Sequence, residues 1–193
     1  MSTLERLRNE TRAAHSELET TVGIERRVTN LPEYTRLLER FYGFYQPLEE
    51  QLENLGDWEA EGIAFPARRK LPWLEADLLA LQHTPESIAA LPRCASLPRL
   101  ESLANGFGCA YVLEGATLGG RHISSMLRET SIPNNARHFF GSYGPAVGER
   151  WREFTAALDQ FGGKGAQDEI IEAARGTFSA LQHWLTDGKG GKA

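Results

Sequence analysis

Apolar residues recur along most of the chain at intervals of three and four positions, the spacing of one face of an α-helix. This pattern predicts helices over residues 3–22, 31–52, 73–82, 99–129, 146–161 and 166–186. Thr3 is the expected N-cap of the first helix, and Pro47 is expected to kink the second. No segment between them carries a β-hairpin signal. The sequence therefore predicts an all-α fold.

Prolines and glycines are concentrated between these periodic stretches, where they predict loops. The expected loops cover residues 56–71, 83–98, 131–145 and 162–165. We expect one helical domain over residues 1–187, followed by a disordered tail at 188–193 that is rich in glycine and lysine.

Composition narrows the class of protein. The chain has 193 residues, of which 41% are hydrophobic, enough for one domain with a core. Its net charge of −5 disfavours a nucleic-acid partner. No apolar run is long enough to span a membrane and no signal peptide is evident, so we expect a soluble, cytoplasmic protein. Cys94 and Cys109 are expected to be reduced thiols.

The predicted helix over residues 99–129 contains an unusual number of glycines: Gly106, Gly108, Gly115, Gly119 and Gly120. Each costs about 1 kcal/mol relative to alanine, so together they cost on the order of 4–5 kcal/mol, which something must offset. One helical face carries Gly108, Tyr111, Gly115, Gly119, His122 and Met126. A face without side chains allows either tight helix–helix packing or close approach of a flat ligand.

His15 is the second irregular feature. It lies within about 20° of the apolar stripe that runs from Leu4 to Val22, so it is expected on the buried face of the first helix. It is either a hydrogen-bonded core residue or a metal ligand through a neutral imidazole nitrogen. Glu19, one turn on, could accept a hydrogen bond from the other ring nitrogen, and Arg8 places a cation on the same side. Together with the glycine face, these residues suggest a haem site.

Several segments resemble the haem oxygenase family. Residues 11–19 (TRAAHSELE) resemble its proximal helix, with a threonine four positions before the haem-ligating histidine and a glutamate four positions after it. Residues 113–120 (LEGATLGG) resemble its distal helix, and residues 41–50 and 170–178 are also similar to the family. The order and separation of these segments, which span nearly the whole chain, make the resemblance specific.

The resemblance implies a role for particular residues. His15 would be the proximal ligand of the haem iron and Glu19 its hydrogen-bond partner. On the distal helix, Gly115 and Gly119 would form the wall and Gly120 would give the kink. The haem propionates would meet Arg8, Tyr111 and a further basic residue, for which Arg150 is our choice and Arg152 the neighbour; Phe178 would line the apolar part of the pocket.

The implied activity is oxidative cleavage of haem b, both substrate and cofactor, to biliverdin, ferrous iron and carbon monoxide. It would use molecular oxygen and electrons from an external donor such as ferredoxin or another reductase. The LEGATLGG variant is most similar to bacterial enzymes that make biliverdin for bacteriophytochromes. Ala116 departs from the family, which usually has Asp or Ser there to anchor ordered water. Backbone carbonyls or Thr117 would then have to hold that water.

Other interpretations remain open at this point. The chain could be a non-enzymatic haem carrier or sensor on the same fold, an interpretation that Ala116 favours. It could also be a haem-free relative acting on a small metabolite, such as a thiamin-pyrimidine hydrolase, although Cys109 lies about 120° off the glycine face. His122 could make a polar contact or act as a second ligand. The triplet Arg68-Arg69-Lys70 could be a solvated face or a docking patch for an acidic electron donor.

Overall fold

The computed structural model describes residues 1–186, which form nine α-helices joined by turns and contain no β-strand. The helices are α1 (Thr3–Val22), α2 (Ile24–Arg27), α3 (Leu31–Glu53), α4 (Leu71–Ala80), α5 (Pro85–Ala89), α6 (Leu103–Leu127), α7 (His138–Gly141), α8 (Val147–Phe161) and α9 (Gln167–Thr186). The all-α prediction is therefore confirmed. The expected tail at 188–193 lies outside the described residues.

The ends of several helices differ from the prediction for identifiable reasons. Ser2, not Thr3, caps α1: its hydroxyl accepts from the Glu5 amide at 3.2 Å, and the Glu5 carboxylate accepts from the Ser2 amide at 2.8 Å. Thr3 is instead buried, with its hydroxyl accepting from Gln167 at 3.2 Å. In α6 the Ser102 hydroxyl caps the first turn, so the helix begins later than periodicity alone predicts.

The segment expected to separate the last two helices is not an open loop. Gly162–Ala166 forms a π-helical turn that links α8 directly to α9. The change of direction falls at Gly165, whose φ of +99° is accessible to glycine without strain. Similarly, α3 continues through Pro47 to Glu53.

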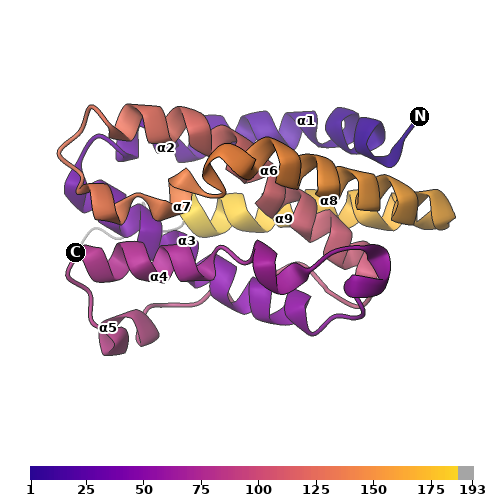
Figure 1. Cartoon of the computed structure of the whole chain (residues 1–193), viewed down its shortest axis with the longest axis horizontal. Coiled ribbons are helices and arrows are strands. Elements are labelled where there is room, and N and C mark those ends of the chain that lie inside the picture. Colours follow the sequence, from indigo (N-terminus) through magenta and orange to yellow (C-terminus); the bar gives the residue numbers. More distant parts are fainter. Residues whose placement is uncertain (187–193) are drawn as a thin grey trace.

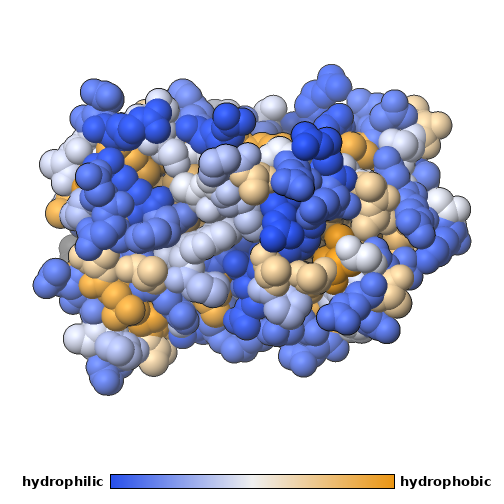
Figure 2. Space-filling view, viewed as in Figure 1, coloured by the Kyte–Doolittle hydropathy of each residue, from blue (hydrophilic) through white to orange (hydrophobic). Residues whose placement is uncertain are grey.

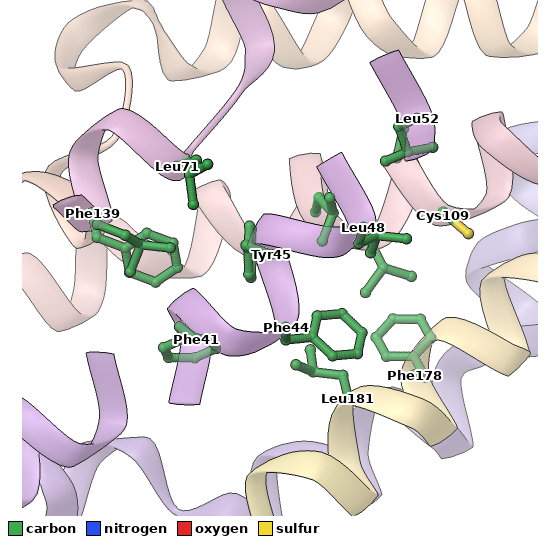
Figure 3. Close-up of a cluster of buried hydrophobic side chains, with 14 of the residues drawn as sticks. Phe41, Phe44, Tyr45, Leu48, Leu52, Leu71, Cys109, Phe139, Phe178 and Leu181 are labelled. Atoms are coloured by element: carbon green, nitrogen blue, oxygen red, sulfur yellow. The ribbon is translucent and has the colours of Figure 1, made fainter. Parts of the chain in front are cut away.

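Helix α9 is the central support of the fold, because both α1 and α6 pack along it. Figure 1 shows α1 along one long edge of the molecule and α4 and α5 at the opposite edge, with α6, α8 and α9 between them. The core lies where α3 meets α9: Phe44 and Leu48 of α3 face Phe178 and Leu181 of α9 (Figure 3). The core thus packs against α9, and α9 in turn positions α1 and α6.

The face of the molecule seen in the view of Figure 1 is mostly polar. Figure 2 shows a predominantly hydrophilic face with small, separate apolar patches. Among the described helices, none has the length and apolar character needed to cross a bilayer.

Candidate functional site

Helices α1 and α6 are held side by side by α9 but make few direct contacts with each other. Near one end, burial raises the pKa of Tyr111 on α6, and the Thr11 hydroxyl and the Arg8 charge on α1 oppose that shift. Near the other end, His122 Nε2 of α6 lies 3.0 Å from Oε1 of Glu25, just beyond α1. These two contacts show that the helices run in the same direction.

Four of the predicted residues lie along the two helices between those contacts. This stretch contains His15 and Glu19 on α1, and Gly115 and Gly119 on α6. We call it the α1–α6 interval. Residues about a hundred positions apart in the sequence thus lie on two facing helices, as the haem-site hypothesis requires.

The five glycines of α6 divide into two groups. A Cβ at Gly108 would lie 2.2 Å from the carbonyl oxygen of Ile170, and one at Gly120 would lie 2.7 Å from that of Phe140. Gly106 is similarly closed, by Leu55 and Trp58. These three glycines allow close helix packing, so for them the packing interpretation is correct.

Gly115 and Gly119 behave differently. A Cβ at Gly119 would meet no atom within 4 Å, and one at Gly115 would meet only Trp151, at 3.9 Å. Packing within the protein therefore gives no reason for glycine at either position. Bare backbone that faces open space is what a flat ligand needs for close approach.

His15 is exposed, so the prediction that it lies on the buried face of α1 is wrong. Its side chain is 55% exposed, although Leu7, Thr11 and Val22 of the same stripe are buried. On the neighbouring helix α6, Gly115 and Gly119 carry no side chain that could cover the imidazole. The ring lies edge-on to Phe178 of α9, with centroids 5.7 Å apart.

Glu19 lies beside His15 as predicted, but the contact is loose. Its Oε2 is 3.6 Å from Nδ1 of His15, too far for a hydrogen bond. Both side chains are more than half exposed. The carboxylate can therefore reach the imidazole with a small rotation, while Nε2 of His15 remains available.

The predicted propionate contacts are partly brought together. Arg8 is exposed on α1 beside Tyr111, whose ring packs on Trp151 of α8 at 5.9 Å. Arg150 contacts other groups: Nη1 lies 3.4 Å from the Glu153 carboxylate, and its guanidinium is 5.8 Å from the Tyr143 ring. Arg152 is exposed and lies near Gly148.

Thr117 cannot anchor water on the open face of α6. Its hydroxyl donates to the Glu114 carbonyl at 2.6 Å, and its side chain is buried. Ala116, by contrast, is exposed next to Gly115. Of the two alternatives for holding distal water, only backbone carbonyls remain.

The α1–α6 interval fits a flat ring that carries a metal and anionic substituents. It offers an accessible imidazole on one side, open glycine backbone on the other, and Phe178 at the α9 side. Arg8 and Tyr111 supply a cation and a phenol at one end. A neutral imidazole ligates iron, and guanidinium and phenol groups bind carboxylates.

Two residues of the basic triplet, Arg68 and Lys70, are buried and so form neither a solvated face nor a docking patch, whereas Arg69 is partly exposed and pairs with Glu53. Arg68 is 5% and Lys70 3% exposed, and both contact the carboxylate of Glu114, which is itself buried. Arg68 Nη1 is 2.9 Å from Glu114 Oε2, Lys70 donates to Oε1, and the Tyr143 hydroxyl donates to Oε1 at 2.8 Å. We call Arg68, Lys70, Glu114, Tyr143 and Glu49 the Glu114 cluster.

Glu49 completes the cluster from α3. It is 1% exposed and accepts from the backbone amides of Lys70 at 2.6 Å and Leu71 at 3.2 Å. Burial raises the pKa of Glu49 and lowers that of Lys70, and the charges of their partners oppose both shifts. The sequence did carry a signal for this cluster, because Glu49 and Glu114 stand within the apolar faces of α3 and α6.

His122 makes a polar contact with Glu25. Both side chains are more than 60% exposed, and the pair joins α6 to α2 at the end of the α1–α6 interval. His122 is thus a polar contact between helices in this structure.

Cys109 is not placed to act as a nucleophile. Its sulfur accepts from the Thr177 hydroxyl at 3.0 Å inside the core, and burial raises the pKa of the thiol to about 11. Only the deprotonated thiolate is reactive, so an enzyme mechanism based on this cysteine finds no support.

We predict that Cys109 resists alkylation in the folded protein. At pH 8, a thiol with this pKa is ionised in roughly one molecule in a thousand. Iodoacetamide should leave the Cys109 peptide unmodified in native protein and modify it fully in denaturant, as measured by mass spectrometry. Rapid stoichiometric labelling of native protein would contradict the buried position.

Comparison with known proteins gives one consistent family. A family model described as "Heme oxygenase" matches residues 1–187. The chain is 34% identical over 153 residues to a heme oxygenase of Xanthomonas campestris pv. campestris (strain 8004), covering 76% of this chain and 84% of that protein.

Solved structures show the same fold. Heme oxygenase from Leptospira interrogans superposes with a TM-score of 0.77 at 20% identity, covering 97% of this chain and 100% of that chain. The NO- and CO-bound heme oxygenase from Neisseria meningitidis superposes with a TM-score of 0.80 at 18% identity, covering 100% of this chain and 94% of that chain. At such identities, the similarity establishes the fold alone.

Proposed function

This chain belongs to the haem oxygenase family and is an enzyme that degrades haem, and we propose that its substrate lies in the α1–α6 interval with His15 as the iron ligand. The observation that carries this proposal is the pair of open glycines, Gly115 and Gly119, on the helix that faces an exposed histidine. Neither feature has a reason within the protein alone, and a haem ring between them accounts for both.

Each residue of the interval has a proposed task. Nε2 of His15 binds the iron, and Glu19 accepts from Nδ1 so that the imidazole keeps one tautomer. Arg8 and Tyr111 hold the propionates, with Arg150 a further candidate, and Phe178 contacts the apolar side of the ring. Gly115 and Gly119 let the backbone of α6 cover the distal side, and Gly120 lets α6 approach Phe140.

Bound haem supplies both the iron at which oxygen is activated and the ring that is cleaved, with electrons from an external donor such as ferredoxin or another reductase. The protein contributes position and exclusion of bulk water. Because the Ala116 side chain has no polar group and Thr117 donates to the Glu114 carbonyl, backbone carbonyls of α6 would be the groups that hold water for proton delivery.

We further propose that the product is biliverdin, released with ferrous iron and carbon monoxide, and that it serves as chromophore for a bacteriophytochrome. The LEGATLGG segment, through its resemblance to enzymes with that role, supports this assignment.

One experiment tests the proposal directly. Purified protein is mixed with one equivalent of hemin, then given ascorbate or a ferredoxin–reductase couple in air with catalase present. Loss of the Soret band and growth of the broad red band of biliverdin after iron chelation is the expected result. A complex that stops at an oxygen-bound Soret spectrum would contradict turnover and favour a carrier.

Two glycine substitutions on the same helix should have opposite effects. Gly108→Ala places a methyl group 2.2 Å from the Ile170 carbonyl, so we expect a loss of about 1–3 kcal/mol in unfolding free energy. Gly119→Ala meets nothing and should retain or slightly raise stability, by up to about 1 kcal/mol. We nevertheless expect Gly119→Ala, and more strongly Gly119→Leu, to weaken hemin binding.

Urea unfolding of the haem-free protein and hemin titration separate the two effects. If Gly119→Leu binds hemin as tightly as the unmodified protein, the distal wall is not at Gly119.

A further inference from the structure

A hollow of about 530 Å³ lies at the turn from α1 into α2, beside α3 and the end of α9. Its charged lining consists of Arg26, Arg27, Arg36 and Arg40, with Glu33 and Glu39. Counted as formal charges, four cations and two anions leave a surplus of two positive charges, in a chain whose net charge is −5. Positive charge is therefore concentrated here against the overall sign of the protein.

Other side chains already engage the two carboxylates. Glu33 pairs with Arg36, and its Oε2 is 3.9 Å from Nε of Arg27. Glu39 faces away towards His83, whose Nε2 lies 3.1 Å from its Oε1. Neither glutamate bonds the remaining N–H groups of Arg27.

Arg27 shows that the arginines lining this hollow have too few acceptors. Its side chain is only 14% exposed, and its buried Nη1 has no hydrogen-bond partner in the described structure. Burial lowers the pKa of Arg27, and the charges of Arg36 and Arg40 lower it further, although Glu33 opposes them. A buried donor with no acceptor, next to like charges, is costly and would gain from an anionic ligand.

One neighbouring cation, Arg40, is held in place, and a second, Arg26, lies close to the backbone. The guanidinium of Arg40 stacks on the Trp184 ring at 3.6 Å and donates to the Trp184 carbonyl. The guanidinium of Arg26 folds over Gly23, where a Cβ would approach it to 2.7 Å. Cations fixed before binding lose little freedom when an anion arrives.

From this geometry we propose that the hollow binds the phosphate groups of a small polyanion. Several guanidinium groups around one space match phosphate oxygens, which accept paired N–H bonds. Six of the nine lining residues are charged and only Val22 and Leu185 are large hydrophobic residues, so a compact, densely charged ligand fits better than a tetrapyrrole. The phosphates could come from free diphosphate or from a nucleotide, and the test separates these sources.

The test is isothermal titration calorimetry of the full chain with sodium diphosphate. It is done at low ionic strength, because salt screens the attraction between arginine and phosphate. We expect saturable binding, and a loss of affinity of about tenfold or more in Arg27→Gln and in Arg36→Gln. Arg36 is 62% exposed, so its variant should fold normally even if Arg27→Gln does not. Arg99→Gln, at an exposed pair with Glu101 outside the hollow, is the matched control and should bind like the parent.

Parallel titrations define the ligand. ADP binding tighter than diphosphate would assign the site to a nucleotide, and diphosphate binding tighter than ADP would assign it to the free anion. Citrate binding as tight as diphosphate would overturn the preference for phosphate. No binding at millimolar diphosphate, or equal binding by Arg36→Gln and the parent, would overturn the site.

Discussion

His15→Ala is expected to reduce haem turnover by more than about 100-fold, because it removes the proposed ligand of the iron. The same change should leave the fold intact: the side chain is 55% exposed and fills no core space, so we expect at most about 0.5 kcal/mol of lost stability. Biliverdin formation from hemin, followed by absorbance, measures the first effect. Urea unfolding of the haem-free protein measures the second.

Three controls make this test specific to ligation. Glu19→Gln should lower turnover by about tenfold or less, since Glu19 only orients the imidazole and its contact is 3.6 Å. His183→Ala, at an exposed histidine bonded to Ser179, should leave the haem spectrum unchanged. Added imidazole should partly restore the Soret spectrum of His15→Ala. Normal turnover by His15→Ala would exclude this residue as the ligand.

Glu114→Gln is expected to give the largest loss of stability, about 3–5 kcal/mol, because it removes the buried carboxylate that two buried cations share. Arg68 and Lys70 are 5% and 3% exposed, and both contact the Glu114 carboxylate. Urea unfolding of haem-free protein, followed by circular dichroism, measures the change.

The pH dependence of this variant has a definite sign. Burial lowers the pKa of Lys70, and Glu114 opposes that shift, so its removal lowers the pKa further. A lysine with a lowered folded-state pKa destabilises the fold when charged, and stability recovers as pH rises towards the ordinary value of 10.5. The deficit of Glu114→Gln should therefore be larger at neutral pH than at pH 10.

Two comparisons test the cluster as a unit. Glu153→Gln removes the exposed carboxylate on Arg68 and should cost no more than about 0.5 kcal/mol. Replacement of Arg68, Lys70 and Glu114 together by Met, Met and Leu should recover much of the loss. A deficit below about 1 kcal/mol in Glu114→Gln would show that water already reaches these charges.

Much of the fold could be predicted because its long helices are amphipathic. The periodic stretches at 31–52 and 146–161 coincide closely with α3 and α8. Helix α2, with four residues, is too short to carry a period and was not predicted. The capping side chains of α1 and α6 also determine the residue at which each helix begins, and the spacing of apolar residues does not show this.

The sequence predicted candidate residues for the site, but not the environment of each. A face that packs on a ligand and a face that packs on the core have the same spacing, so the apolar stripe of α1 could not reveal that His15 is exposed. The prediction that the basic triplet is exposed was wrong for Arg68 and Lys70 for a related reason. Their partner Glu114 is 44 residues from Lys70, and such pairing depends on the packing of α6 against the segment before α4.

The Glu114 cluster also constrains how this protein can evolve. Substitution of Glu114 alone leaves Arg68 and Lys70 without the buried carboxylate that they share, so a lineage that changes this residue first passes through an intermediate of reduced stability. The three residues should therefore be inherited together or be absent together. Relatives with an apolar residue at the position of Glu114 are expected to have lost both cations, and their α6 is then held by ordinary packing.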